Sequence, residues 1–257
     1  MHPSAPDFSI VVPLYNEEAC AGRSIRELLE ALEARWAGRY ELILVINGST
    51  DGTVAICERF ATGYPQVRTV RFMKNQGYGG GILGGLNQAR GAYCGFTCGD
   101  GQTPPDVLTR LMAEIADGDD DVVKAIRIHR RDGLMRHLQS AVYNWSFGCL
   151  FHMPAHDINA MPKLMRRETF RRLALESTDW FIDAEIMIKA HHARMRVREL
   201  PAPYVGRSGG ASAVRLNTCL EFLRNAVRVI VSGRLAAWKH LTPQPESEGI
   251  PTYATNP

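Results

Sequence analysis

The chain has 257 residues, of which 45% are hydrophobic and 22% charged, a composition that excludes a disordered or fibrous protein and is typical of one large domain or two small ones. Thirty basic and 27 acidic residues leave a net charge of +3, which is too small to argue for a nucleic-acid partner. No apolar run approaches the ~18 residues of a membrane-spanning helix, no secretory signal follows Met1, and the six cysteines include no Cys-x-x-Cys pair. We therefore expect a cytoplasmic protein with free thiols.

The first 130 residues alternate short β-rich apolar runs with longer helical patterns. The expected strands are 8–13, 42–46, 67–72, 93–97 and 122–128, and the expected helices are 22–37, 53–62, 82–90 and 105–116. This alternation predicts an α/β fold with a mostly parallel sheet and flanking helices. The loops that follow the first four strands are 14–18, 47–52, 74–81 and 98–104. Parallel sheets bind ligands at the carboxyl ends of their strands, so we expect these loops to share one site.

The second half of the chain has a less regular pattern. We expect helices near 134–151, 167–175 and 181–193 and a strand at 197–200. Segment 214–241 contains an amphipathic helix with an apolar face and a basic face, which predicts either a lid packed on the main domain or peripheral contact with the inner face of an anionic membrane. The proline-containing segment 242–257 is expected to be a flexible tail.

Four motifs follow the first four expected strands in order. They are PLYNEE at 13–18, NGSTDGT at 47–53, NQGYG at 75–79 and CGDGQTPP at 98–105. Together they resemble family-two glycosyltransferases of the GT-A fold, and most closely the polyprenyl (dolichyl) phosphate mannose synthase branch. The resemblance extends over about residues 8 to 213 and implies a single catalytic domain, 1–213. It implies an inverting transfer of a sugar from a nucleoside-diphosphate sugar, GDP-mannose or a UDP-sugar, to a polyprenyl phosphate or a hydroxyl acceptor.

The resemblance also implies where the donor binds. Its base, ribose and diphosphate would contact Pro13, Tyr15, Glu17, Asn47, Asn75, Gly77, Asp100 and Gln102. Asp100 and Gln102 would hold the diphosphate directly or through Mg²⁺ or Mn²⁺. The chain departs from the family at Ile46-Asn47, which replaces an acidic pair, and at Cys98, which replaces the first aspartate of D-x-D. These cations prefer oxygen ligands, so we expect weakened metal binding.

The acceptor side is implied by later motifs. Asp183, in the segment WFIDAE, would be the general base for a hydroxyl acceptor, whereas a phosphate acceptor is already an anion and needs none. A simple acidic first helical turn is the alternative interpretation of this segment. Arg127 and Lys163 would hold an acceptor phosphate or the leaving diphosphate, and Arg207 would neutralise the departing phosphate. An idle arginine in a mobile surface loop is the alternative for Arg207.

Three further alternatives remain open. The second motif by itself also fits a turn in which Thr50 caps the following helix. Gly79–Gly84 satisfies G-x-G-x-x-G, and Asp100 follows at about the 20-residue distance of a ribose-binding acid, which is the pattern of an NAD-dependent dehydrogenase. Two strand–helix units precede these glycines, however, and the dinucleotide motif usually opens its domain. Finally, Cys98 and Ile46 favour a domain that binds nucleotide sugar without turnover.

Overall fold

The computed structural model describes residues 5–128, 147–148, 150–153, 156–203, 235 and 238, and the backbone of 253–255. One sheet of eight strands runs through this part of the chain, in the order β3-β2-β1-β4-β6-β5-β7-β8. Its strands are β1 (Phe8–Leu14), β2 (Tyr40–Asn47), β3 (Val67–Phe72), β4 (Tyr93–Phe96), β5 (Val122–Ile128), β6 (Lys163–Arg166), β7 (Val197–Pro203) and β8 (Tyr253–Thr255). The helices are α1 (Ala21–Trp36), α2 (Thr53–Gly63), α3 (Gly77–Leu86), α4 (Pro105–Asp117), α6 (Arg167–Leu173) and α7 (Ile182–His192).

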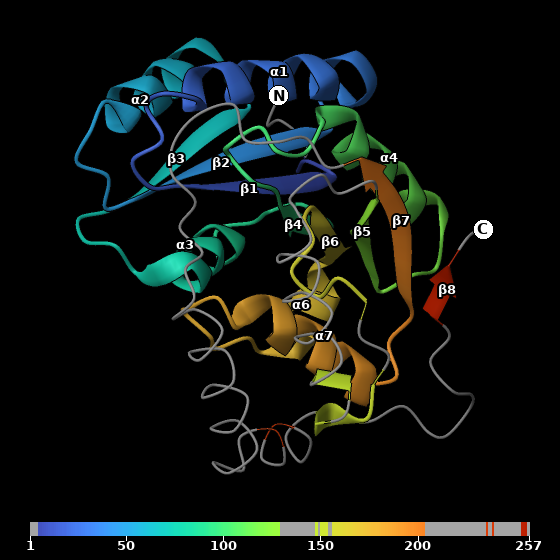
Figure 1. Ribbon diagram of the computed structural model, residues 1–257. Coiled ribbons are helices and arrows are strands. Elements are labelled where there is room, and N and C mark those ends of the chain that lie inside the picture. The colour runs from blue at the N-terminus through green and yellow to red at the C-terminus, as the bar shows by residue number, and fades with distance from the viewer. Residues whose placement is uncertain are drawn as a thin grey trace.

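The helices cover the sheet on both faces. In Figure 1, α1, α2 and α4 lie on one face and α3, α6 and α7 on the other. Strand β2 is buried along its whole length, and its residues alternate between the two cores: Leu42 and Leu44 pack with α1 and α4, whereas Ile43 and Val45 pack with α3 and α7. Strands buried on both faces read as continuous apolar runs, which is why the first strands are visible in the sequence.

Most expected elements are confirmed within one to three residues at each end. Two findings differ from expectation in the first 200 residues. Helix α3 begins at Gly77, not at 82, so much of the third expected loop is helical. Strand β6 was not expected at all, and it pairs antiparallel with both β4 and β5. The sheet is therefore mixed, with β1, β2, β3 and β4 parallel to one another at the end that carries the first three motifs.

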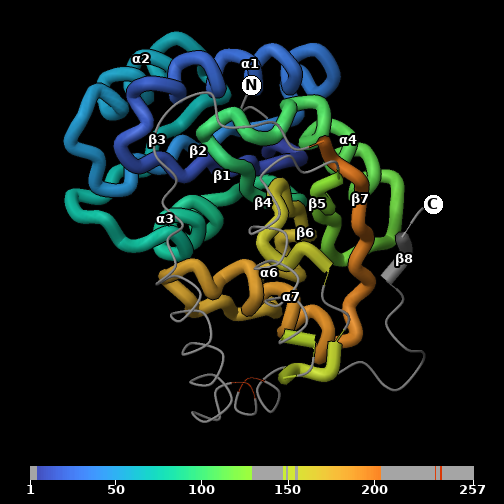
Figure 2. Tube along the Cα trace, viewed as in Figure 1, coloured from blue at the N-terminus to red at the C-terminus, as the bar shows by residue number. Residues whose placement is uncertain are grey.

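Most of the predictions for the C-terminal part of the chain concern residues outside the described ones. This holds for Arg207, for most of the expected helix at 134–151 and for most of 214–241, of which Leu235 and Trp238 are helical. Within the segment expected to be a flexible tail, Tyr253–Thr255 forms β8, parallel to β7. Figure 2 follows the Cα trace of the described residues from β1 to β7 in the same view as Figure 1. No helix in the described part is long and apolar enough to cross a membrane.

Close packing explains the glycines of α3. A Cβ on Gly79 would lie 2.3 Å from the carbonyl oxygen of Ser177, and one on Gly84 would lie 2.4 Å from the ring of Phe72. The N-terminus of α3 therefore lies against the segment that precedes α7, and its C-terminal half packs against β3. These contacts account for the G-x-G-x-x-G pattern without a dinucleotide.

Gly85 offers a test of this packing. A Cβ there would lie 2.4 Å from Val11 Cγ1 and 2.8 Å from Val45 Cγ2, and these β-branched side chains have little freedom to move. We expect Gly85→Ala to lower the free energy of unfolding by about 1–3 kcal/mol. Gly63→Ala is the matched control, because a Cβ there meets nothing within 4 Å. Urea unfolding of both variants measures the difference, and equal stabilities would contradict the packing account.

Candidate active site

The first two motif loops are joined by backbone-to-side-chain hydrogen bonds. The N–H groups of Asn16, Glu17 and Glu18 donate to Ser49 Oγ (3.1 Å), Thr53 Oγ1 (2.9 Å) and Asp51 Oδ2 (3.1 Å), and Thr50 N donates back to Asn16 Oδ1 (2.8 Å). Beside them Pro13 is partly buried and Tyr15 is 48% exposed. Thr50 is not the cap of α2, because Gly52 holds that position and Asp51 accepts the N–H of Thr53.

The side chain of Asn47 holds the third motif in place. It is buried, and its Nδ2 donates to the carbonyl oxygen of Gly77 (2.9 Å) and to Asn75 Oδ1 (3.3 Å), while its Oδ1 accepts from the N–H of Gln76 (2.9 Å). A carboxylate accepts hydrogen bonds but cannot donate them. Asparagine in place of the family's aspartate therefore fixes the turn that opens α3. The structure brings Asn47, Asn75 and Gly77 together, as predicted.

The fourth motif contributes one carboxylate. Asp100 Oδ1 accepts the N–H of Gln102 (3.0 Å), and the Cys98 thiol lies 3.6 Å from Thr103 Oγ1. Burial, with the nearby charge of Asp100, raises the pKa of Cys98 to about 12, so its thiol is protonated at neutral pH. Among the described residues, no group of three or more histidine, cysteine or acidic side chains is arranged so that it could hold a metal ion by itself. Mg²⁺ is commonly held by one or two carboxylates together with substrate phosphates, and Asp100 fits that arrangement.

The predicted acceptor residues lie beside a row of buried charges. Lys163, Lys124 and Glu199 stand in register on neighbouring strands β6, β5 and β7, and each is at most 2% exposed. A buried charge is costly unless it is paired. Lys124 Nζ pairs with Glu199 Oε1 at 2.8 Å, and Lys163 Nζ pairs with Asp183 on α7.

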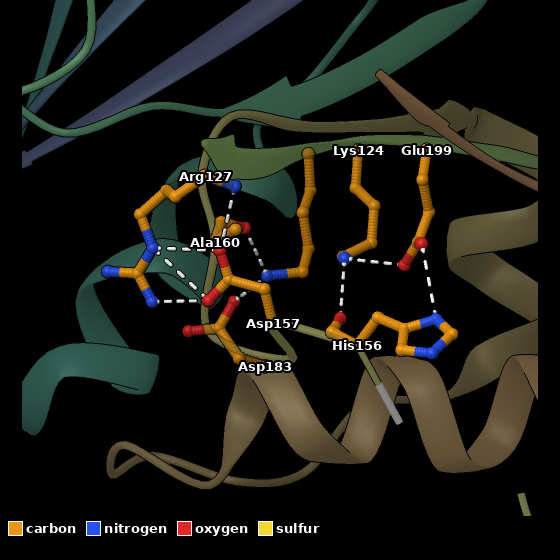
Figure 3. A network of polar contacts seen from close by, with 8 residues as sticks. Lys124, Arg127, His156, Asp157, Ala160, Asp183 and Glu199 are labelled. Carbon is orange, nitrogen blue, oxygen red and sulfur yellow. Dashed lines mark hydrogen bonds and ion pairs between the residues drawn. The ribbon is translucent and has the colours of Figure 1, made fainter. Parts of the chain in front are cut away.

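The same cations hold one loop, residues 156–160. Lys124 Nζ donates to the carbonyl oxygen of His156 (3.0 Å), and Lys163 Nζ donates to that of Ala160 (2.7 Å). Between them, the guanidinium of Arg127 pairs with the Asp157 carboxylate. Figure 3 shows these side chains converging on the loop from the strands above it. The loop and Asp183 are therefore fixed relative to the sheet.

The predicted acceptor residues differ in accessibility. Lys163 is fully buried against Asp183, which is itself 2% exposed, and burial lowers the pKa of Lys163 while the charge of Asp183 opposes that shift. The side chain of Arg127 is 21% exposed. The two predicted cations therefore occupy different environments, and only Arg127 reaches solvent.

Sequence reasoning missed several residues at this site. Tyr78, between two glycines of the third motif, stacks on Trp180 with ring centroids 4.2 Å apart, and its hydroxyl lies 2.9 Å from Met161 Sδ. Burial and the charge of Asp183 raise the pKa of Tyr78 well above its usual value. The sequence signal for Tyr78 was that an aromatic residue stands between two glycines of a motif loop. Lys124 and Glu199 gave no comparable signal, because their partners are distant in sequence.

Glu185, two residues after Asp183, has a different set of partners. Its carboxylate accepts the N–H groups of Glu176 and Ser177 and pairs with Lys189 at 2.7 Å. It thereby fixes the chain on which α3 packs, and Gly80 N donates to the carbonyl oxygen of Thr178 (2.9 Å). Asp183 lies in the first turn of α7, so the acidic-turn interpretation of this segment also describes the structure.

Comparison with known proteins bears on this arrangement. The sequence profile described as "Glycosyl transferase family 2" matches residues 9–173. The chain belongs to this family. Among solved structures, glucosyl-3-phosphoglycerate synthase from Mycobacterium tuberculosis, in complex with Mn²⁺, UDP-glucose and phosphoglyceric acid, aligns with a TM-score of 0.64 at 19% identity, covering 91% of this chain and 80% of that one. This likeness confirms the GT-A fold.

Curated relatives carry more specific names. The dolichyl-phosphate beta-glucosyltransferase of Saccharomyces cerevisiae is 26% identical over 82% of this chain and 70% of its own length. The dodecaprenyl-phosphate galacturonate synthase of Rhizobium johnstonii is 28% identical over 66% of this chain. The chain spans only half the length of that second relative. The chain belongs to a glycosyltransferase family, and the packing of α3 already explains the G-x-G-x-x-G glycines. The dehydrogenase alternative therefore has no remaining support.

Because the Lys163–Asp183 ion pair is buried, we expect substitutions of its two residues to have strongly coupled effects on the free energy of unfolding. Removing one partner leaves a buried charge without compensation, so Lys163→Met or Asp183→Leu alone should lower the free energy of unfolding by about 3–5 kcal/mol. The double variant should lose less than either single variant, because no uncompensated charge remains. Urea unfolding of all three variants measures this. Losses that simply add would show that the two side chains do not act as a pair.

We expect the side chain at position 98 to determine how tightly the site binds a metal ion. Cys98→Asp restores a second carboxylate beside Asp100, and we expect it to lower the Kd for Mn²⁺ at least tenfold in calorimetric titrations with nucleoside diphosphate present. Cys98→Ser, which adds no charge, is the control and should change the Kd little. An unchanged Kd in Cys98→Asp would mean that this position does not face a cation.

Proposed function

We propose that this chain is an inverting glycosyltransferase that moves a sugar from a nucleoside-diphosphate sugar to a polyprenyl phosphate. Both curated relatives described above are named for polyprenyl-phosphate acceptors, which supports this acceptor class. A nucleotide-sugar donor agrees with the four motif loops at one end of the sheet. GDP-mannose and UDP-sugars are the donors to test first.

One observation carries the choice of acceptor. Asp183, the candidate base for a hydroxyl, is engaged by the fully buried ammonium of Lys163, whereas the Arg127 side chain is partly exposed. A guanidinium suits the bidentate recognition of phosphate. A phosphate oxygen is already an anion and needs no base. The side chains near Asp183 therefore favour an acceptor phosphate over a hydroxyl.

The reaction follows from this placement. A phosphate oxygen of the acceptor attacks the anomeric carbon, a new carbon–oxygen bond forms, and the bond from that carbon to the diphosphate breaks on the opposite face. Arg127 would hold the acceptor phosphate, and Asp100 with Gln102 would hold the donor diphosphate. A divalent cation bound at Asp100 would neutralise charge on the leaving group. We also assign this neutralising role to Arg207, as the sequence resemblance implies.

The acceptor implies contact with a membrane surface, because polyprenyl chains reside in bilayers. The basic amphipathic segment 214–241 is the candidate for this contact. We propose peripheral association, with the sugar transferred at the headgroup level.

The direct test is turnover on a panel of nucleotide sugars with polyprenyl phosphate, polyprenol or no acceptor, followed by mass spectrometry. We expect a sugar-linked polyprenyl phosphate and release of nucleoside diphosphate only when the phosphate acceptor is present. Asp100→Asn should lower turnover at least tenfold, which is about 1.4 kcal/mol of barrier. Transfer to polyprenol in preference to its phosphate would contradict the proposal. Donor binding without turnover would identify a binding domain instead.

A further inference from the structure

Three cations anchor the 156–160 loop, but only one of them is placed to meet a ligand. Lys124 and Lys163 are fully buried and neutralised by Glu199 and Asp183. Arg127, at the end of β5, retains 21% side-chain exposure. An acceptor phosphate arriving from solvent can therefore reach Arg127 without displacing a buried pair. The orientation of the Arg127 guanidinium therefore decides how well it can bind the acceptor phosphate.

Asp157 fixes that orientation through several bonds. Its Oδ2 accepts the backbone N–H of Arg127 at 2.8 Å and the Nε–H at 2.9 Å, and its Oδ1 accepts from Nη2. The carboxylate thus holds both the start and the end of the arginine side chain. Such a two-point contact selects one rotamer from the many that a free arginine visits.

The backbone conformation of Asp157 is strained, which indicates a specific role for this residue. Its φ is +38°, in the left-handed region that non-glycine residues rarely adopt. Aspartate and asparagine tolerate this region better than other side chains, but it still stores strain. Lys124 and Lys163 hold the carbonyl groups on either side of this residue, which keeps the strained conformation in place. The Asp157 carboxylate is therefore held in a fixed position beneath Arg127.

We propose that Asp157 is a positioning residue, which orients the Arg127 guanidinium toward the phosphate of the acceptor. This inference rests on the proposed function. Asp157 also carries a negative charge that opposes an incoming anion, but this charge is buried and already engaged by donors on Arg127. The hydrogen bonds and charge of Arg127 lower the pKa of Asp157, although burial alone would raise it, so the carboxylate stays ionised at neutral pH. Fixing the guanidinium before binding therefore outweighs the repulsion.

The test compares Asp157→Asn with the wild type. Asparagine keeps the shape and tolerates the left-handed backbone, but its amide nitrogen cannot accept hydrogen bonds from Arg127. We expect the KM for a polyprenyl phosphate to rise at least tenfold, with kcat at saturation and the Kd for nucleoside diphosphate within about threefold of wild type. In an Arg127→Ala background, Asp157→Asn should have no further effect on KM, because its action passes through Arg127.

Two further variants separate positioning from stability. Asp120→Asn breaks another largely buried Arg–Asp pair, in which Asp120 accepts from Arg198 Nε, and it should lower stability without changing the acceptor KM. Asp157→Gly relieves the backbone strain but removes the whole carboxylate, and it should raise the acceptor KM at least as much as Asp157→Asn does. A purely structural role would instead make KM follow stability across these variants.

The outcomes distinguish this inference from the proposed function. If the wild type transfers sugar to polyprenyl phosphate but Asp157→Asn leaves KM unchanged or lower, the inference is overturned and the function stands. An equal further loss in the Arg127→Ala background also overturns it. If the wild type shows no transfer, the proposed function fails, and calorimetry with farnesyl phosphate still decides the inference. Weaker binding of this probe by Asp157→Asn supports positioning, and unchanged binding or no binding to the wild type overturns it.

Discussion

Two lysines and a glutamate lie side by side in the interior of the sheet, and the proposed acceptor side of the molecule is organised by the need to compensate their charges. Lys163, Lys124 and Glu199 are removed from water by strands β6, β5 and β7. Their charges are satisfied only if Asp183 on α7 and the carbonyl groups of the 156–160 loop take fixed positions. The need to pair these buried charges therefore fixes the positions of α7 and of the 156–160 loop. The loop requires no regular secondary structure to hold its place.

The proposed donor side is organised by hydrogen bonds and small residues. Asn47 ties the end of β2 to the turn before α3, and glycines let α3 approach the chain that leads into α7. Tyr78, stacked on Trp180, lies where these two parts meet, close to the charge of Asp183. The motif loops and the surroundings of Asp183 are therefore in contact through α3. In the proposed function, donor and acceptor meet near this contact.

The sequence predicted the parts of the fold that depend on local pattern. Strands such as β2 are continuous apolar runs followed by motif loops, so both their existence and their shared site could be foreseen. Strand β6 could not, because it is short and begins with a lysine, which local pattern assigns to the surface. Its burial depends on Asp183, 20 residues away. In the same way, Asn47 was expected to contact the nucleotide, and only the structure reveals that its amide is engaged by the third motif.

The central claim is that an acceptor phosphate meets Arg127 while the Lys163–Asp183 pair stays intact. The most direct measurement is a crystal structure of the protein with nucleoside diphosphate and a short-chain polyprenyl phosphate. We predict the acceptor phosphate within hydrogen-bond distance of the Arg127 guanidinium, with Lys163 still bound to Asp183. A phosphate bound instead to a Lys163 released from Asp183, or an acceptor hydroxyl donating to Asp183, would contradict this account.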